Sequence, residues 1–163
     1  MNISHQDHIK ALQWIVNLLR SHDIPFLVCG GLATIGYGAK RDLNDIDLFV
    51  PTEHFRRVVA LGKTHISKPA QHYCEAAEGW DLEYVQFIYS GVKIEVGNPD
   101  SAKILDHASG RWVDLQLDFS SVEITQVFGI ELPLIKQEEL TAYKSKLARA
   151  VDQQDIRAMH PSD

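Results

Sequence analysis

The sequence predicts an α+β fold in which helices flank a mixed β-sheet, with residues 1–163 forming a single domain. Three observations lead to this prediction. A length of 163 residues suits one domain, and 45% hydrophobic residues are enough to build a core. The expected order of elements is helix, strand, short helix, strand and helix, followed by a group of strands and a C-terminal helical segment at 137–160.

Apolar spacing and turn residues predict the first elements. Apolar side chains recur at helical spacing across residues 6–21, which indicates an amphipathic helix, and Pro25 follows its end. Short apolar runs predict strands at 26–29 and 45–50, with a short helix at 32–37 between them.

A helix is expected to follow, opening at Pro51 with Thr52 as its N-cap and ending at Gly62. The pattern is lost across residues 63–80, which we therefore predict to be a loop.

The second half of the chain is predicted to be mainly strands. Two runs of β-forming residues separated by Ser90-Gly91 are typical of a hairpin with strands at 82–89 and 92–96. The remaining predicted elements are a helical turn or two at 101–107, strands at 112–119, 122–128 and 130–135, and a C-terminal helix that residues 155–159 continue or restart.

Composition excludes several classes of protein. Sixteen basic residues against 22 acidic ones give a net charge of -6, so nucleic acid is not an expected partner. The N-terminus lacks the apolar region of a signal peptide, and no stretch is long enough to span a membrane. We therefore expect a cytoplasmic protein. Cys29 and Cys74 do not have the spacing of a zinc site or a redox pair.

Gly30-Gly31 follows a predicted strand and precedes a predicted helix. Glycine lets the backbone approach a ligand closely, and free N–H groups at a helix N-terminus favour a bound phosphate. Many strand-to-helix turns use glycine for packing only, so a purely structural interpretation stays open.

Asp45 and Asp47 lie two residues apart in a predicted strand, so their side chains project from the same face. Two carboxylates this close repel each other unless a cation or a basic residue lies between them. A hard divalent cation such as Mg²⁺, or Mn²⁺, suits an oxygen-only site. The alternative is a pair of solvent-facing aspartates on an edge strand, although Asp is disfavoured in strands.

Glu95 is a candidate third carboxylate, provided that its strand lies beside the strand of Asp45 and Asp47. It could then ligate a metal or deprotonate an attacking hydroxyl. Asp114 and Asp118 are rivals for the same role.

Lys144 falls between Leu140 and Leu147 on the apolar face of the C-terminal helix. A lysine there either extends its ammonium group to solvent or reaches a buried anion. A triphosphate would be such an anion.

The spacing of these motifs resembles a known family. Gly30-Gly31, thirteen intervening residues and then Asp45-Ile46-Asp47-Leu48 are similar to the signature of the nucleotidyltransferase superfamily with the DNA polymerase beta-like fold. The likeness is to its small bacterial members, of the minimal and the lincosamide or aminoglycoside types. Arg41 also resembles a recurrent arginine of those members, and residues 139–155 resemble their closing helical segment.

The resemblance implies metal-dependent transfer of a nucleoside monophosphate from a nucleoside triphosphate, with ATP as the first candidate, to a hydroxyl of a small molecule or protein. Asp45, Asp47 and Glu95 would hold the metal and carry catalysis. The nucleotide would be bound by Gly30, Gly31, Arg41 and Lys144. Two departures are visible in the sequence, because many relatives have serine at position 31 and most have aspartate as the third carboxylate.

Alternatives remain open at this point. The chain could be a catalytically degenerate relative that binds a nucleotide or a protein partner, for example in a toxin-antitoxin-type pair, or the Asp pair could be structural. The acceptor is either small, or a second chain forms the other wall of the site, as a homodimer or a partner protein. Contacts to the acceptor could come from His65, His72, Tyr73 and Trp80.

Overall fold

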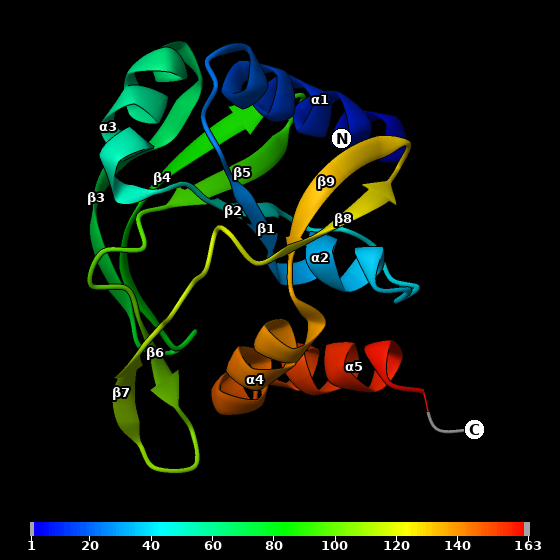
Figure 1. Ribbon diagram of the computed structural model, residues 1–163, viewed down its shortest axis with the longest axis vertical. Coiled ribbons are helices and arrows are strands. Elements are labelled where there is room, and N and C mark those ends of the chain that lie inside the picture. The colour runs from blue at the N-terminus through cyan, green and yellow to red at the C-terminus, as the bar shows by residue number, and fades with distance from the viewer. Residues whose placement is uncertain (1, 162–163) are drawn as a thin grey trace.

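The computed structural model describes residues 2–161, in which helices and strands first alternate and a run of seven strands and two helices then follows (Figure 1). The elements are α1 His5–Ser21, β1 Leu27–Cys29, α2 Gly30–Gly36, β2 Ile46–Phe49, α3 Thr52–Leu61, η1 Lys63–His65, β3 Ile66–Glu75, β4 Trp80–Tyr89, β5 Val92–Gly97, β6 Lys103–Asp106, β7 Arg111–Asp114, β8 Val122–Val127, β9 Ile130–Ile135, α4 Gln137–Leu147 and α5 Ala150–Met159. The η1 element is a single turn of 3-10 helix.

The strands form one mixed sheet in the order β7-β6-β4-β5-β2-β1-β9-β8, and β3 pairs with β4 outside this path. Strand β2 runs parallel to β5, and β1 runs parallel to β9, whereas the other pairs are antiparallel. The predicted fold class, a mixed sheet flanked by helices, is therefore confirmed.

Alternation along β2 and β5 divides the sheet into an apolar face and a polar face. Ile46 and Leu48 of β2 pair with Ile94 and Val96 of β5, and all four side chains are buried. Helix α1 packs against β4 and β5, while α4 and α5 lie at the other end of the molecule, where α4 packs against β6 (Figure 1). The residues between the apolar ones, on β2 and β5, point to the opposite face.

Helix α1 begins where the sequence changes from polar to amphipathic. The Ser4 hydroxyl accepts the backbone N–H of Asp7, and the Asp7 carboxylate accepts the backbone N–H of Ser4, which forms a capping box. The buried stripe of the helix matches the predicted apolar spacing. No helix within residues 2–161 is long and apolar enough to cross a membrane.

The C-terminal helical segment restarts rather than continues. Helix α4 ends at Leu147, and Ala148 adopts a left-handed backbone conformation with φ of 52°. Helix α5 begins at Ala150, so the two helices meet at a sharp corner. This corner brings the side chains of α5 back towards α4.

The predicted loop at 63–80 is wrong, because most of it is strand β3. The strand pairs only with β4, and many of its side chains are exposed, so it lacks an apolar alternation. Its pairing register also shifts between Ile66 and Gln71, around Pro69. Because the strand lies at an edge, contains proline and pairs irregularly, its sequence does not show the apolar periodicity that would predict a strand.

Three smaller predictions are also wrong. The helical turn at 101–107 is strand β6, and the strand expected at 112–119 ends at Asp114. Thr52 does not cap α3, whose N-cap residue is Pro51. The Thr52 hydroxyl instead donates to the side-chain oxygen of Asn98 at 2.8 Å, a partner 46 residues away that local spacing does not reveal.

Candidate active site

A cavity of about 360 Å³ opens on the polar face of β2 and β5, between the sheet and the C-terminal helices. All seven residues selected from the sequence line it. They are Gly30, Gly31, Arg41, Asp45, Asp47, Glu95 and Lys144. Residues from β2, β5, α2 and α4 thus meet at one place, although they are spread over more than 110 positions of the chain.

The parallel pairing of β2 with β5 sets Asp47 directly beside Glu95. Asp45 lies one residue before β2 and lines the same cavity. The three carboxylates that the sequence singled out are therefore neighbours. None of them forms an ion pair with another residue in the part of the chain that the structure describes.

The rival third carboxylates lie elsewhere. Asp114 is exposed on β7, where it forms an ion pair of 2.6 Å with Lys103. Asp118 is exposed, and its carboxylate accepts hydrogen bonds from Ser120. Neither residue lines the cavity, so Glu95 is the one of the three candidates that lies beside Asp45 and Asp47.

The surroundings of these carboxyl groups favour their protonated forms. Burial, followed by repulsion from Asp45, raises the pKa of Asp47 to about 6. Burial, followed by repulsion from Asp47 and Asp45, raises the pKa of Glu95 to about 8. Burial also raises the pKa of Asp45. A cation bound between these groups would offset their repulsion and lower their pKa values.

A hard cation suits this donor set, because the groups offer only carboxylate oxygens and carry negative charge that no basic residue neutralises by direct contact. Within residues 2–161, however, no three His, Cys, Asp or Glu side chains are already grouped in a way that could hold a metal ion.

Gly30 and Gly31 form the first turn of α2 instead of preceding it as expected. Gly30 has a φ of +61°, and a β-carbon at this position would collide with the Asp47 carboxylate. A β-carbon on Gly31 would lie 2.8 Å from the guanidinium Nη2 of Arg41. The two glycines therefore leave space for two other side chains of the site.

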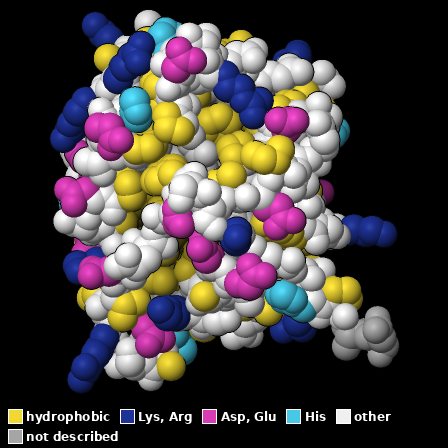
Figure 2. All heavy atoms as spheres, viewed as in Figure 1, with side chains coloured by type: hydrophobic (Ala, Val, Ile, Leu, Met, Phe, Trp, Pro, Cys, Tyr) yellow, Lys and Arg dark blue, Asp and Glu magenta, His cyan; other side chains and the backbone are white. Residues whose placement is uncertain are grey.

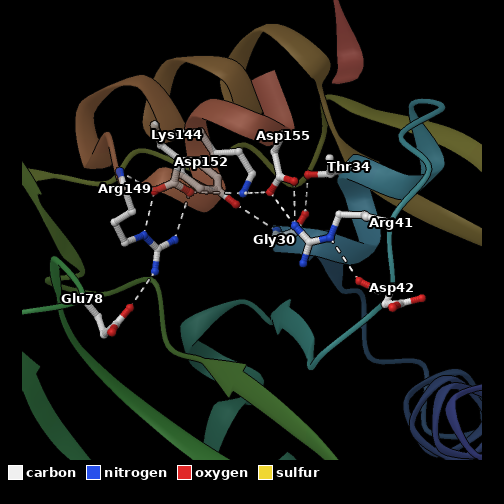
Figure 3. Close-up of polar contacts among 10 residues, drawn as sticks. Gly30, Thr34, Arg41, Asp42, Glu78, Lys144, Arg149, Asp152 and Asp155 are labelled. Carbon is white, nitrogen blue, oxygen red and sulfur yellow. Dashed lines mark hydrogen bonds and ion pairs between the residues drawn. The ribbon is translucent and has the colours of Figure 1, made fainter. Parts of the chain in front are cut away.

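Lys144 and Arg41 belong to a buried network of charges (Figure 3). The Lys144 side chain, 4% exposed, contacts Asp155 at 2.9 Å and Asp152 at 3.3 Å. The Arg41 Nη1 atom contacts both carboxylate oxygens of Asp155, at 2.6 and 2.7 Å. The buried anions that Lys144 reaches are therefore two carboxylates from α5.

Arg149 connects this network to the other wall of the cavity. Its guanidinium group donates to both oxygens of Asp152, at 2.6 and 3.0 Å, and to Glu78 at 3.0 Å. Glu78 lies in the turn between β3 and β4, so the contact ties α5 to that turn (Figure 3).

Several residues of the cavity were missed by sequence reasoning. Glu75, Tyr84 and Tyr143 line it. Glu75 was missed because its strand, β3, was predicted to be a loop. Tyr143 was missed because the helical projection singled out the neighbouring residue Lys144. Tyr84 is buried, and its hydroxyl donates to Glu75 at 2.6 Å.

The four aromatic and histidine residues considered for acceptor contact separate in the structure. Only Trp80 lines the cavity. His65 packs against Trp14, His72 pairs with Asp81, and Tyr73 packs against Tyr84.

Acidic side chains gather around a basic one near the middle of the face shown in Figure 2.

No protein-family model matches this chain, and no curated protein matches it in sequence. Solved structures do match it. A nucleotidyltransferase candidate from Thermotoga maritima is 19% identical, with 94% of this chain and 92% of that chain covered and a TM-score of 0.70.

Two antibiotic-modifying proteins are also similar in structure. ANT(2")-Ia, solved with adenylyl-2"-tobramycin, is 12% identical over 93% of this chain and 87% of its own, with a TM-score of 0.63. The lincosamide antibiotic adenylyltransferase LnuA, solved with lincomycin, is 14% identical over 99% of both chains, with a TM-score of 0.61. The protein thus has the fold of the nucleotidyltransferase superfamily, as the spacing of the glycine and aspartate motifs indicated.

We expect Glu95→Gln to stabilise the metal-free protein at alkaline pH. A carboxyl group whose pKa is raised by folding contributes its full stability below the unfolded pKa, near 4.5, and loses it as pH rises through about 8. Glutamine does not ionise, so the gain in free energy of unfolding over wild type should grow by about 1–2 kcal/mol between pH 5 and pH 9. Urea unfolding in the presence of EDTA measures it.

Glu131→Gln is the matched control, because Glu131 is exposed on β9 and does not line the cavity. Its effect should not grow with pH. If Glu95→Gln also gives a difference that is the same at both pH values, Glu95 is not destabilised by its neighbours.

We expect Asp155→Asn to destabilise the protein strongly. The substitution leaves the Arg41 guanidinium and the Lys144 ammonium without the carboxylate that they share, and breaking a buried ion pair from one side costs about 3 kcal/mol. Asp114→Asn removes the exposed pair with Lys103 and should cost less than about 1 kcal/mol. Equal losses in chemical unfolding would contradict the structural role of Asp155.

Proposed function

We propose that the protein is a metal-dependent nucleotidyltransferase that moves a nucleoside monophosphate from a nucleoside triphosphate, with ATP as the first candidate, to an acceptor hydroxyl. The observation that carries this proposal is the meeting of Asp45, Asp47 and Glu95 in one cavity with the glycine turn. The shared fold supports it, because the neighbours include adenylyltransferases.

In this proposal Asp45 and Asp47, together with Glu95, would hold Mg²⁺ or Mn²⁺. The metal, when bound, neutralises phosphate charge and polarises the phosphorus that is attacked. As the acceptor hydroxyl attacks, the Glu95 carboxylate would accept its proton. The acceptor oxygen then bonds to the α-phosphorus, the bond from the α-phosphorus to the bridging oxygen breaks, and pyrophosphate leaves.

The chain supplies the surroundings of the phosphates as well. Gly30 and Gly31 lack side chains, which leaves room for the Asp47 carboxylate and the Arg41 guanidinium group beside the proposed phosphate position. The Arg41 Nη2 atom lies next to Gly31, while Nη1 is held by Asp155, so one end of the guanidinium group is anchored and the other is available. Lys144 also lines the cavity, where it is paired with Asp152 and Asp155.

A second candidate function is nucleotide or partner binding without transfer. One observation favours it: the positive charges of Arg41, Lys144 and Arg149 are already paired with carboxylates of the protein. Binding and turnover must therefore be measured separately.

Binding is tested by thermal unfolding with Mg²⁺ and ATP. At a ligand concentration of about 100 times Kd, the midpoint of wild-type unfolding should rise by about 5–10 °C. Asp47→Asn should abolish this rise, because the amide does not replace the carboxylate as a metal ligand. Asp114→Asn, outside the cavity, should keep it. If wild type and Asp47→Asn respond alike, the metal role of Asp47 is wrong.

Transfer is tested by the release of pyrophosphate from ATP. Wild type should release pyrophosphate only when a hydroxyl acceptor is present, and a panel would start with tobramycin and lincomycin because structural neighbours were solved with these compounds or a derivative. Loss of a general base reduces such rates by about 10²–10⁴, so Glu95→Gln should be slower by this factor. Nucleotide binding without release across the panel would favour the second candidate function.

A further inference from the structure

Tyr143 is a buried side chain of the cavity to which neither the sequence motifs nor the proposed reaction gives a role. It lies on α4 next to Lys144, is 5% exposed and lines the cavity. Its ring packs edge-on against Trp80, with the ring centroids 5.8 Å apart. Packing on this side and burial on the others hold the hydroxyl in one place.

In the part of the chain that the structure describes, the Tyr143 hydroxyl accepts a hydrogen bond but does not donate one. It accepts the backbone N–H of Gly30 at 2.8 Å, and within residues 2–161 it donates no hydrogen bond of its own. A tyrosine hydroxyl has one hydrogen to donate as well as lone pairs to accept. Leaving a buried donor without an acceptor costs free energy, so a donor kept at a cavity wall suits a ligand.

The surroundings indicate which ligand would accept this hydrogen. Burial raises the pKa of Tyr143, so the hydroxyl keeps its hydrogen at neutral pH. The adjacent turn at Gly30 and Gly31 offers no side-chain donor, and the Lys144 ammonium group, 5.9 Å from the Tyr143 ring centroid, is already paired with Asp152 and Asp155. Hydrogen bonds to charged oxygens are the strong ones, and phosphate provides such oxygens.

We propose that the Tyr143 hydroxyl donates a hydrogen bond to a phosphate oxygen of the bound nucleotide, while the Gly30 N–H holds that hydroxyl in position. This proposal rests on the proposed function, because it takes the nucleotide to be the ligand. It makes Tyr143 a phosphate-binding residue in which a hydroxyl from α4 supplies what the glycine turn lacks.

The test compares Tyr143→Phe with wild type for two ligands, ATP with Mg²⁺ and adenosine. Adenosine carries the base and the ribose but no phosphate. Loss of one hydrogen bond to a charged group weakens binding about tenfold or more, so Kd for ATP should rise by this factor and Kd for adenosine should stay unchanged. Calorimetry measures the first affinity and ligand-detected NMR the second.

Tyr37→Phe is the matched control. It also removes one tyrosine hydroxyl with a backbone partner, the carbonyl of Ile135 at 2.6 Å, but Tyr37 does not line the cavity. It should leave both affinities unchanged. An equal loss for ATP and adenosine in Tyr143→Phe, or no loss for either, would overturn the proposal.

If Tyr143→Phe does not fold because Gly30 loses its partner, 3-fluorotyrosine at position 143 decides the question. Fluorine makes the hydroxyl a stronger donor and keeps the bond from Gly30. Binding of ATP relative to adenosine should become tighter, and an unchanged ratio would overturn the proposal. Failure of wild type to bind ATP at all would instead contradict the proposed function.

Discussion

The parallel pairing of β2 with β5 is the constraint on which the site depends. It places the Asp47 and Glu95 carboxyl groups side by side on one face of the sheet. Strands that run parallel need a long crossover between them, and residues 50–91 provide it as α3, η1, β3 and β4. The segment that makes the pairing possible therefore also supplies a wall of the cavity, including Trp80 and Tyr84.

The two sides of the cavity differ in whether their charged groups are paired. On the sheet, burial and mutual repulsion raise the pKa of Asp47 and Glu95, and no basic residue within residues 2–161 pairs with them. On the helices, Lys144 is buried with two carboxylates that offset its charge. The apolar packing behind β2 and β5 stabilises a fold that keeps uncompensated carboxyl groups together.

Much of the fold and the main residues of the site could be predicted because their signals are local. Each of these signals lies within a short segment of the sequence: the hairpin spacing, the helical periodicity and the two-residue step from Asp45 to Asp47. That Glu95 lies beside Asp45 and Asp47 could be predicted only on the condition that their strands are neighbours, because strand order depends on long-range contacts. Strand β3 could not be found, because an edge strand with exposed residues and Pro69 lacks periodicity. The pairing of Lys144 with Asp155 required the corner at Ala148, which no local pattern marks.

Gly31 has a consequence for how this sequence can change. The space above its α-carbon is filled by the Arg41 guanidinium, and that group is held in turn by Asp155. A side chain at position 31 would require the Arg41 guanidinium group to shift, which changes its contact with Asp155. Positions 31, 41 and 155 are therefore coupled, so the effect of a substitution at one of them depends on the residues at the other two.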